Sequence, residues 1–405
     1  MPLIWSQPSK RRWRPSLVSA AAALLLLGSA AVAQDQPVAA IGDQPIEIVG
    51  AEGSGTLLVF SSRPLLARMP GVTRLLVMVH GAGRDADHAE AQGVAAVGAA
   101  ADQMLVVAPQ FLSEADFRRW TLPGDRLRWA GLGWAKGDVA IGPAPVSPFS
   151  ALDSLVHGLA DPSLLPNLKA VTIAGQGEGA DFVQLYAAAT THLAALEARG
   201  IGFRFVLAGP DHYLYLDEAR PVPADTTSCA GFNQWPYGLD GAPAYLDELG
   251  PARIFTQYRA RDVVILLGKP GAGGDGACAT LAEGPDRAAR GRNYLAYLAK
   301  LAAAPVHRLA EMPTIEGNAL FGSACGVAAL LDRPDCPALA AASAVPAFPE
   351  PAAAPDAPAQ PPVAPAAPPP PVVPDQVEPG GLVDPLHEAD PLLPRAPPPE
   401  HPPPR

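Results

Sequence analysis

Residues 170–179 read Ala170-Val171-Thr172-Ile173-Ala174-Gly175-Gln176-Gly177-Glu178-Gly179, and this stretch decides the fold. Its first five residues form a short, mainly apolar run, which is typical of a strand buried on both faces. A glycine-rich turn follows, and then a helical pattern with one apolar stripe, formed by Phe182, Leu185, Tyr186, Ala189, Leu193 and Leu196. The pattern predicts a single helix over 179–199 that ends at Gly200.

Seven further apolar segments resemble this strand in length and in their flanking Gly, Pro, Asp or Asn residues. Two of them, 46–49 and 57–61, predict a leading hairpin that turns around Gly53-Ser54-Gly55. The others lie at 75–79, 104–108, 203–208, 263–267 and 306–312. Because helical patterns separate most of them, we expect an α/β fold: a mostly parallel, doubly wound sheet of about eight strands with helices on both faces.

In such sheets ligands bind at the carboxyl ends of the strands, so the turn after 170–174 is a candidate site. Residues 175–179 keep the spacing of G-x-S-x-G, a sharp turn that presents a nucleophilic serine between a strand and a helix. The central residue here is Gly177, which has no side chain and hence no nucleophile. The dinucleotide fingerprint G-x-G-x-x-A also fits, but four predicted strands precede it, so no nucleotide cofactor is expected.

Motifs elsewhere in the chain carry a family resemblance. They are Val79-His80-Gly81-Ala82-Gly83-Arg84-Asp85-Ala86-Asp87, Val106-Val107-Ala108-Pro109-Gln110-Phe111, Trp134-Ala135-Lys136-Gly137-Asp138, Tyr213-Leu214-Tyr215-Leu216-Asp217, Trp235-Pro236-Tyr237-Gly238-Leu239, Glu283-Gly284-Pro285-Asp286-Arg287 and Arg290-Gly291. With them the chain resembles the secreted or periplasmic α/β-hydrolases, which are serine esterase-like proteins of bacteria and fungi. The resemblance covers most of 55–335 and implies the α/β-hydrolase fold.

Three departures from this family concern its catalytic serine, acid and histidine, which act together. Gly177 stands at the serine position. Residues 313–318, after the last predicted strand, contain no histidine, and His307 comes too early. The loop 268–272 lacks the expected acid, and Asp275 is the nearest carboxylate. The serine that attacks the substrate, the histidine that transfers the proton and the acid that orients the histidine are all absent from their expected positions. We therefore expect a protein that has lost hydrolysis and acts as a binding or scaffold module.

The candidate ligand contacts are His80, Gly81, Ala82, Arg84, Gly177 and Glu178. Backbone N–H groups of Glu178 and of Gly81 or Ala82 are placed to bind an anion such as a carboxylate, although the Glu178 side chain opposes this unless it turns outward. We expect His80 to be structural, and Arg84 either to line the cleft or to face water. The ligand, a small molecule or a protein, is not identified by the sequence.

An alternative is an ester hydrolase of unusual mechanism that activates water in the same cleft. Its candidate groups are Asp211 and His212, which follow the strand at 203–208, and Glu178. The eight histidines are scattered without metal-ligand spacing, so no metal and no other cofactor is expected.

Residues 1–33 are typical of a secretory signal peptide. Lys10, Arg11, Arg12 and Arg14 precede an apolar segment, and Ala31-Val32-Ala33 forms an A-x-A cleavage site. An uncleaved N-terminal anchor is the alternative. We therefore expect a secreted or periplasmic protein with no membrane span after cleavage.

Four cysteines follow the signal: Cys229, Cys278, Cys325 and Cys336. An even number in an exported chain predicts two disulfides. Three pairings are possible, and we favour Cys229–Cys278 with Cys325–Cys336, because the second pair closes a short loop. Free buried thiols are the alternative.

Residues 341–405 hold 23 of the 49 prolines and differ in character from the hydrolase-like domain expected at 34–340. They predict a disordered, acidic, Pro-rich tail, which is either a solvated spacer or a strip that docks a protein. The net charge of −11 argues against binding to nucleic acid or to anionic lipid.

Overall fold

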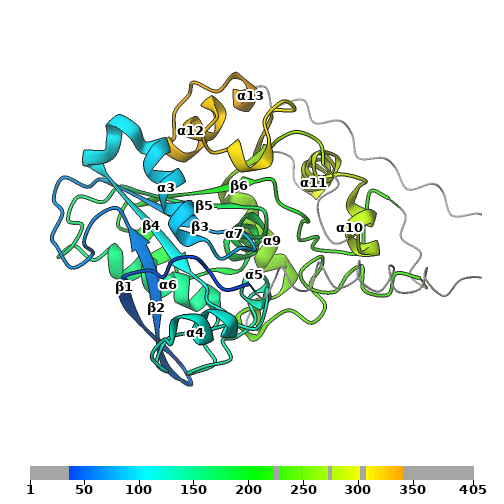
Figure 1. The fold of residues 1–405 in the computed structure, drawn as a ribbon. Coiled ribbons are helices and arrows are strands. Elements are labelled where there is room, and N and C mark those ends of the chain that lie inside the picture. The colour runs from blue at the N-terminus through cyan, green and yellow to red at the C-terminus, as the bar shows by residue number, and fades with distance from the viewer. Residues whose placement is uncertain (1–35, 223–227, 248, 272–275, 302–306, 341–405) are drawn as a thin grey trace, which may run out of the picture. The chain divides into compact units, whose positions relative to one another are not determined.

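A single eight-stranded sheet forms the centre of the fold (Figure 1). The structure is a computed structural model that describes residues 36–222, 228–247, 249–271, 276–301 and 307–340. In this part of the chain the strands are β1 (Gln44–Gly50), β2 (Gly53–Ser61), β3 (Arg74–Val79), β4 (Met104–Gln110), β5 (Ala170–Gln176), β6 (Gly202–Ala208), β7 (Asp262–Leu267) and β8 (Arg308–Glu311). Their order in the sheet is β1-β2-β4-β3-β5-β6-β7-β8.

The hairpin β1–β2 is antiparallel and joins β4 in antiparallel register, whereas all pairs from β4 to β8 are parallel. All eight strands coincide with the apolar segments identified in the sequence. The expected α/β fold with a mostly parallel sheet of about eight strands is therefore confirmed.

Helices connect the strands and cover both faces of the sheet. They are α3 (Ala86–Val97), α4 (Glu114–Trp120), α5 (Gly133–Lys136), α6 (Pro148–Leu159), α7 (Glu178–Ala189), α8 (Ala194–Glu197), α9 (Pro251–Ala260), α10 (Cys278–Glu283), α11 (Arg287–Leu301), α12 (Ala324–Leu331) and α13 (Pro337–Ala340), with short 3-10 turns η1 (Gly98–Gln103), η2 (Ala244–Leu246) and η3 (Gly317–Ala319). In Figure 1, α12 lies on one side of the strands and α6 on the other.

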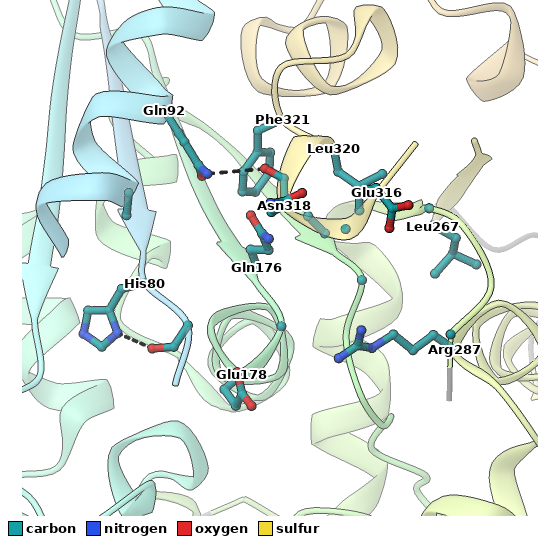
Figure 2. Close-up of a pocket in the computed structure, with 18 of the residues that line it drawn as sticks. His80, Gln92, Gln176, Glu178, Leu267, Arg287, Glu316, Asn318, Leu320 and Phe321 are labelled. Atoms are coloured by element: carbon teal, nitrogen blue, oxygen red, sulfur yellow. Dashed lines mark hydrogen bonds between the residues drawn. The ribbon is translucent and has the colours of Figure 1, made fainter. Parts of the chain in front are cut away.

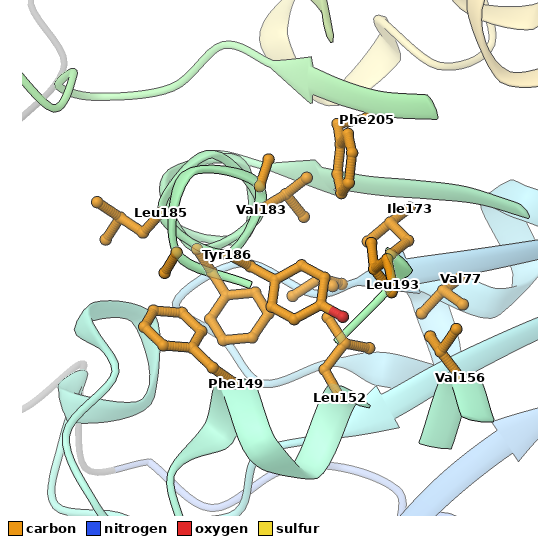
Figure 3. Packing of buried hydrophobic residues seen from close by; sticks show 14 of the residues in the cluster. Val77, Phe149, Leu152, Val156, Ile173, Val183, Leu185, Tyr186, Leu193 and Phe205 are labelled. Carbon is orange, nitrogen blue, oxygen red and sulfur yellow. The ribbon is translucent and has the colours of Figure 1, made fainter. Parts of the chain in front are cut away.

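Two hydrophobic cores follow from the alternation of side chains along the strands. On one face, Val77 and Ile173 pack with α6 and α7, as Figure 3 shows. On the other face, Leu76 and Ala174 pack against α3 and α12. Burial on both faces explains why the strands consist of continuous apolar runs.

Two local predictions are wrong. Gly50 pairs with Gly53, so the hairpin turns at Ala51 and Glu52 and not around Gly53–Gly55, which belongs to β2. The long helix ends at Ala189 because Thr190 is extended (φ −68°, ψ 131°). In this extended conformation its hydroxyl donates a hydrogen bond to Asp153 Oδ1 at 2.9 Å. Of the rest of the apolar stripe, Leu196 lies in a separate short helix, α8, and Leu193 directly precedes that helix.

Both favoured disulfides are present, Cys229–Cys278 and Cys325–Cys336. The first joins the segment before Phe232 to the start of α10, and the second closes α12 onto α13. No helix within the described ranges is long and apolar enough to span a bilayer. The predicted signal peptide at 1–33 and the predicted tail at 341–405 lie outside the described residues.

Candidate functional site

A pocket of about 820 Å³ opens where the parallel strands end (Figure 2). The loops that follow β3, β5, β6, β7 and β8 all contribute to its lining, together with the start of α11. This is the edge of a parallel sheet at which ligands bind in α/β proteins. Four of the six predicted ligand contacts line it: His80, Gly81, Gly177 and Glu178.

The turn between β5 and α7 retains the backbone of a nucleophile turn. Gly177 has φ 56° and ψ −124°, a conformation that side chains rarely adopt. A Cβ added at Gly177 meets nothing within 4 Å, so no steric contact requires glycine there. At Gly179, in contrast, a Cβ lies 2.4 Å from the carbonyl oxygen of His80, so glycine lets α7 pack against the end of β3. The predicted strand–turn–helix is therefore present, and its central residue carries no side chain.

The Glu178 carboxylate turns toward the loop after β3 and not outward. Its Oε2 accepts a hydrogen bond from the backbone N–H of Ala82 at 3.0 Å. Ala82 itself is not among the residues that line the pocket. One of the N–H groups that the sequence analysis assigns to an external anion, that of Ala82, is therefore bonded to a carboxylate of the chain itself.

The lining contains no serine, threonine, cysteine or tyrosine among the residues that the structure describes. Its charged or titratable side chains, besides the buried His80, are Asp85, His88, Glu178, Lys269, Arg287 and Glu316. Amide side chains of Gln92, Gln176 and Asn318 add polar groups. The pocket is therefore strongly polar, and it lacks a hydroxyl or thiol that can form a covalent intermediate.

An ion pair joins the two loops in which the resemblance places the catalytic acid and histidine. Lys269 follows β7, Glu316 follows β8, and their Nζ and Oε1 atoms lie 3.0 Å apart. Sequence reasoning did not single out either residue, although both follow strands at the expected edge. Asp275, the nearest acid in the sequence after β7, lies outside the described residues.

His80 is held in the neutral form by its surroundings. Burial lowers its pKa to about 4. Its Nε2 accepts the backbone N–H of Phe111 at 3.0 Å, and therefore Nδ1 carries the proton and donates to the Gly81 carbonyl at 2.9 Å. The ring also packs 4.5 Å from that of Trp134. His80 thus anchors the loop after β3 and contributes no acceptor to the pocket.

The neutral state of His80 makes stability depend on pH. The unfolded chain, with a pKa of 6.5 at this position, takes up a proton that the folded chain binds only near pH 4. This contribution is complete above pH 6.5 and is lost as the pH falls toward 4. Between pH 7 and pH 5 we expect the wild type to lose up to about 2 kcal/mol more unfolding free energy than His80→Asn. Urea titrations at both pH values measure the difference, and equal losses would contradict the assignment.

Arg84 does not line the pocket, contrary to expectation. Its side chain is 1% exposed and its Nε donates to Asp116 Oδ2 at 2.9 Å. Burial alone raises the pKa of Asp116, but hydrogen bonds from Arg84, Ser113 and Val38 outweigh it and lower the pKa. A buried guanidinium is tolerated only with such a partner, so Arg84 belongs to the support of the loop and neither to the cleft nor to its solvated rim.

Asp211 and His212 also lie outside the pocket lining. Asp211 forms an ion pair with Arg287 at 2.5 Å, and its N–H donates to Asp181 Oδ1 at 2.8 Å. His212 is buried, with Nε2 3.6 Å from Asp181 Oδ2 and its ring 4.8 Å from that of Tyr237. Burial, and then the Asp211 charge, raise the pKa of Asp181 well above its usual value. These groups therefore contact the pocket wall through Arg287 but do not line the pocket.

His307 precedes β8 and is buried, with its Nε2 3.0 Å from the carbonyl oxygen of Tyr258. It therefore lies at the amino end of its strand, whereas the pocket lies at the carboxyl ends. The described residues contain no group of three or more His, Cys, Asp or Glu side chains arranged to hold a metal ion.

Comparison with solved structures places this architecture in the α/β-hydrolase fold. One similar structure is LpqC, described as a poly(3-hydroxybutyrate) depolymerase from Bordetella parapertussis, with a TM-score of 0.50 and 20% identity over 74% of this chain and 94% of that chain. Another is poly(aspartic acid) hydrolase-1 from Sphingomonas sp. KT-1, with a TM-score of 0.47 and 21% identity over 72% and 96% of the two chains. No protein-family model and no curated protein matches the sequence. At this identity the likeness establishes the fold and not the activity.

Proposed function

We propose that this chain is an exported α/β-hydrolase-fold protein that does not hydrolyse esters and serves as a binding or scaffold module. The observation that carries the proposal is Gly177: the turn keeps the backbone of the hydrolase site, but the attacking group is absent. The open, polar pocket beside it is the place where a ligand binds.

The groups around Gly177 support the same conclusion. Acyl transfer in this fold needs a nucleophile, a proton carrier and an acid that orients it. The loops after β7 and β8 instead hold the Lys269–Glu316 ion pair, in which neither group is suited to shuttle a proton from a serine. The Ala82 N–H, which would stabilise an oxyanion, is already bonded to Glu178.

Hydrolysis by activated water is the weaker alternative. Asp211 is paired with Arg287, and His212 packs against Tyr237, outside the pocket lining. Glu178 reaches the pocket, but its carboxylate is turned onto Ala82. Each of the three candidates is therefore engaged with a neighbour, which does not favour its action as a general base on water.

The proposal also includes export of the protein out of the cytoplasm. The signal-like residues 1–33 support it, and the two disulfides are compatible with an oxidising compartment. The Pro-rich residues 341–405 then act as a spacer or as a strip that docks a partner.

Assay of the full-length protein with p-nitrophenyl acetate and butyrate tests the loss of hydrolysis. We expect release of nitrophenol at the rate of buffer alone, and no change in Asp211→Asn, His212→Gln or Glu178→Gln. A serine esterase measured in parallel validates the assay, and circular dichroism verifies that each variant is folded. Turnover above buffer that any one of these substitutions removes would establish the water-activating enzyme instead.

A further inference from the structure

The positive charges that line the pocket are each matched by a carboxylate. Lys269 pairs with Glu316 at 3.0 Å, and Arg287 pairs with Asp211 at 2.5 Å. The half-buried Glu178, in contrast, forms no ion pair with any residue in the described part of the chain. It is therefore a pocket carboxylate without a cationic partner. On the rim, the exposed His88 lies 3.3 Å from Asp85 and balances that carboxylate only when it is protonated.

Glu178 occupies the position at which α/β hydrolases bind an oxyanion with backbone N–H groups. The oxyanion of those enzymes is bound by the N–H of the residue after the nucleophile and by an N–H from the loop after the third strand. Here the residue after Gly177 is Glu178, the first residue of the twelve-residue helix α7. Its own carboxylate bonds to the Ala82 N–H of the loop after β3. The helix N-terminus and this N–H both stabilise the negative charge.

The negative charge of Glu178 acts on at least one neighbouring carboxyl group, that of Asp181. After burial and the Asp211 charge, it contributes to the raised pKa of Asp181 one turn further along α7. An anionic ligand next to the Ala82 N–H is repelled, because the Glu178 carboxylate already occupies that hydrogen-bond donor. A cationic ligand meets a carboxylate whose solvation is already reduced, so the attraction is stronger than in water.

We propose that Glu178 determines the specificity of the pocket: its carboxylate fills the anion position, excludes carboxylate ligands and selects a ligand that carries an ammonium or guanidinium group. The proposal rests on the binding function proposed above and names the ligand class of that site. The inward turn of the side chain onto Ala82 is the observation that carries it.

Three probes that share one carbon chain and differ in charge test the proposal: butylammonium, butyrate and butan-1-ol. They are titrated into the full-length protein while the backbone amide signals of Ala82 and Gly177 are followed by NMR. We expect butylammonium to bind the wild type more tightly than butyrate or butan-1-ol does. We expect Glu178→Gln to weaken butylammonium by about threefold to tenfold. Glu178→Ala, which frees the Ala82 N–H, should allow butyrate to shift the Ala82 signal.

Glu114→Gln is the matched control, because Glu114 is an exposed carboxylate on α4 outside the pocket lining and should leave all three affinities unchanged. The proposal is overturned if butyrate binds the wild type as tightly as butylammonium, if Glu178→Gln binds butylammonium as the wild type does, or if none of the probes binds. The comparison of probes on the wild type requires no variant to fold. Ester turnover would contradict the proposed function whatever the charge preference, whereas loss of the preference alone leaves the non-catalytic assignment intact.

Discussion

Replacement of Asp116 by alanine should lower the free energy of unfolding by about 3–5 kcal/mol, because it removes the carboxylate that pairs with the buried Arg84 guanidinium. The Asp116 side chain is fully buried and accepts hydrogen bonds from Arg84 Nε, from the N–H and hydroxyl of Ser113 and from the N–H of Val38, at 2.7–2.9 Å. Without Asp116 the Arg84 guanidinium stays buried but loses this carboxylate, while carbonyl oxygens such as those of Gln36 and Ala82 carry no full charge to balance it.

Urea unfolding of Asp116→Ala beside Glu114→Ala measures this effect. Glu114 lies two residues earlier on the same helix, and its ion pair with Arg128 at 2.8 Å leaves its side chain 48% exposed. An exposed pair contributes at most about 1 kcal/mol, so Glu114→Ala should cost far less. Equal losses in the two variants would mean that burial of the Arg84–Asp116 pair does not govern its energetics. The pocket should also loosen in Asp116→Ala, since Arg84 belongs to the loop that carries His80 and Ala82.

Replacement of Gly179 by alanine is expected to cost about 2–3 kcal/mol through overpacking. The added Cβ lies 2.4 Å from the carbonyl oxygen of His80 and 2.5 Å from that of Val79. Both are backbone atoms at the end of β3, so neither moves aside as a flexible side chain does. The start of α7 must shift away from the strand, and the Glu178–Ala82 hydrogen bond should lengthen with it.

Gly158→Ala is the control for this substitution. Gly158 also lies in a helix, α6, but a Cβ added there has nothing within 4 Å. Alanine at Gly158 should therefore raise stability by up to about 1 kcal/mol, because it removes the entropic cost of glycine in a helix. Thermal and urea unfolding of both variants should show shifts of opposite sign. A neutral Gly179→Ala would indicate that contact between α7 and β3 is looser than the structure has it.

The central strands β3, β4, β5 and β7 could be predicted from sequence because each is a run of mainly apolar residues whose burial on two faces leaves little choice of conformation. The outer strands β1 and β8 are mostly not buried and were found from apolar segments between turn residues. The strand–turn–helix at 170–179 and the glycine at its centre, Gly177, are equally local, since the turn depends on glycines a few residues apart. The two disulfides followed from compartment and spacing. The helix break at Thr190 was not predicted, because it depends on Asp153, which is remote in sequence.

The direction of polar side chains was decided by tertiary structure alone. From the sequence Arg84 is one more charged residue in a loop, and only the fold brings Asp116 from α4 to neutralise it. The pairing of Lys269 with Glu316, and the turn of Glu178 onto an N–H donated 96 residues earlier, have the same origin. Apolar patterns act locally through periodic burial, whereas a charged group takes whichever partner the packed chain brings within a few ångströms. The sequence alone therefore determined the sheet and the glycine at the centre of the turn after β5, and the packing of the loops decided which charges line the pocket.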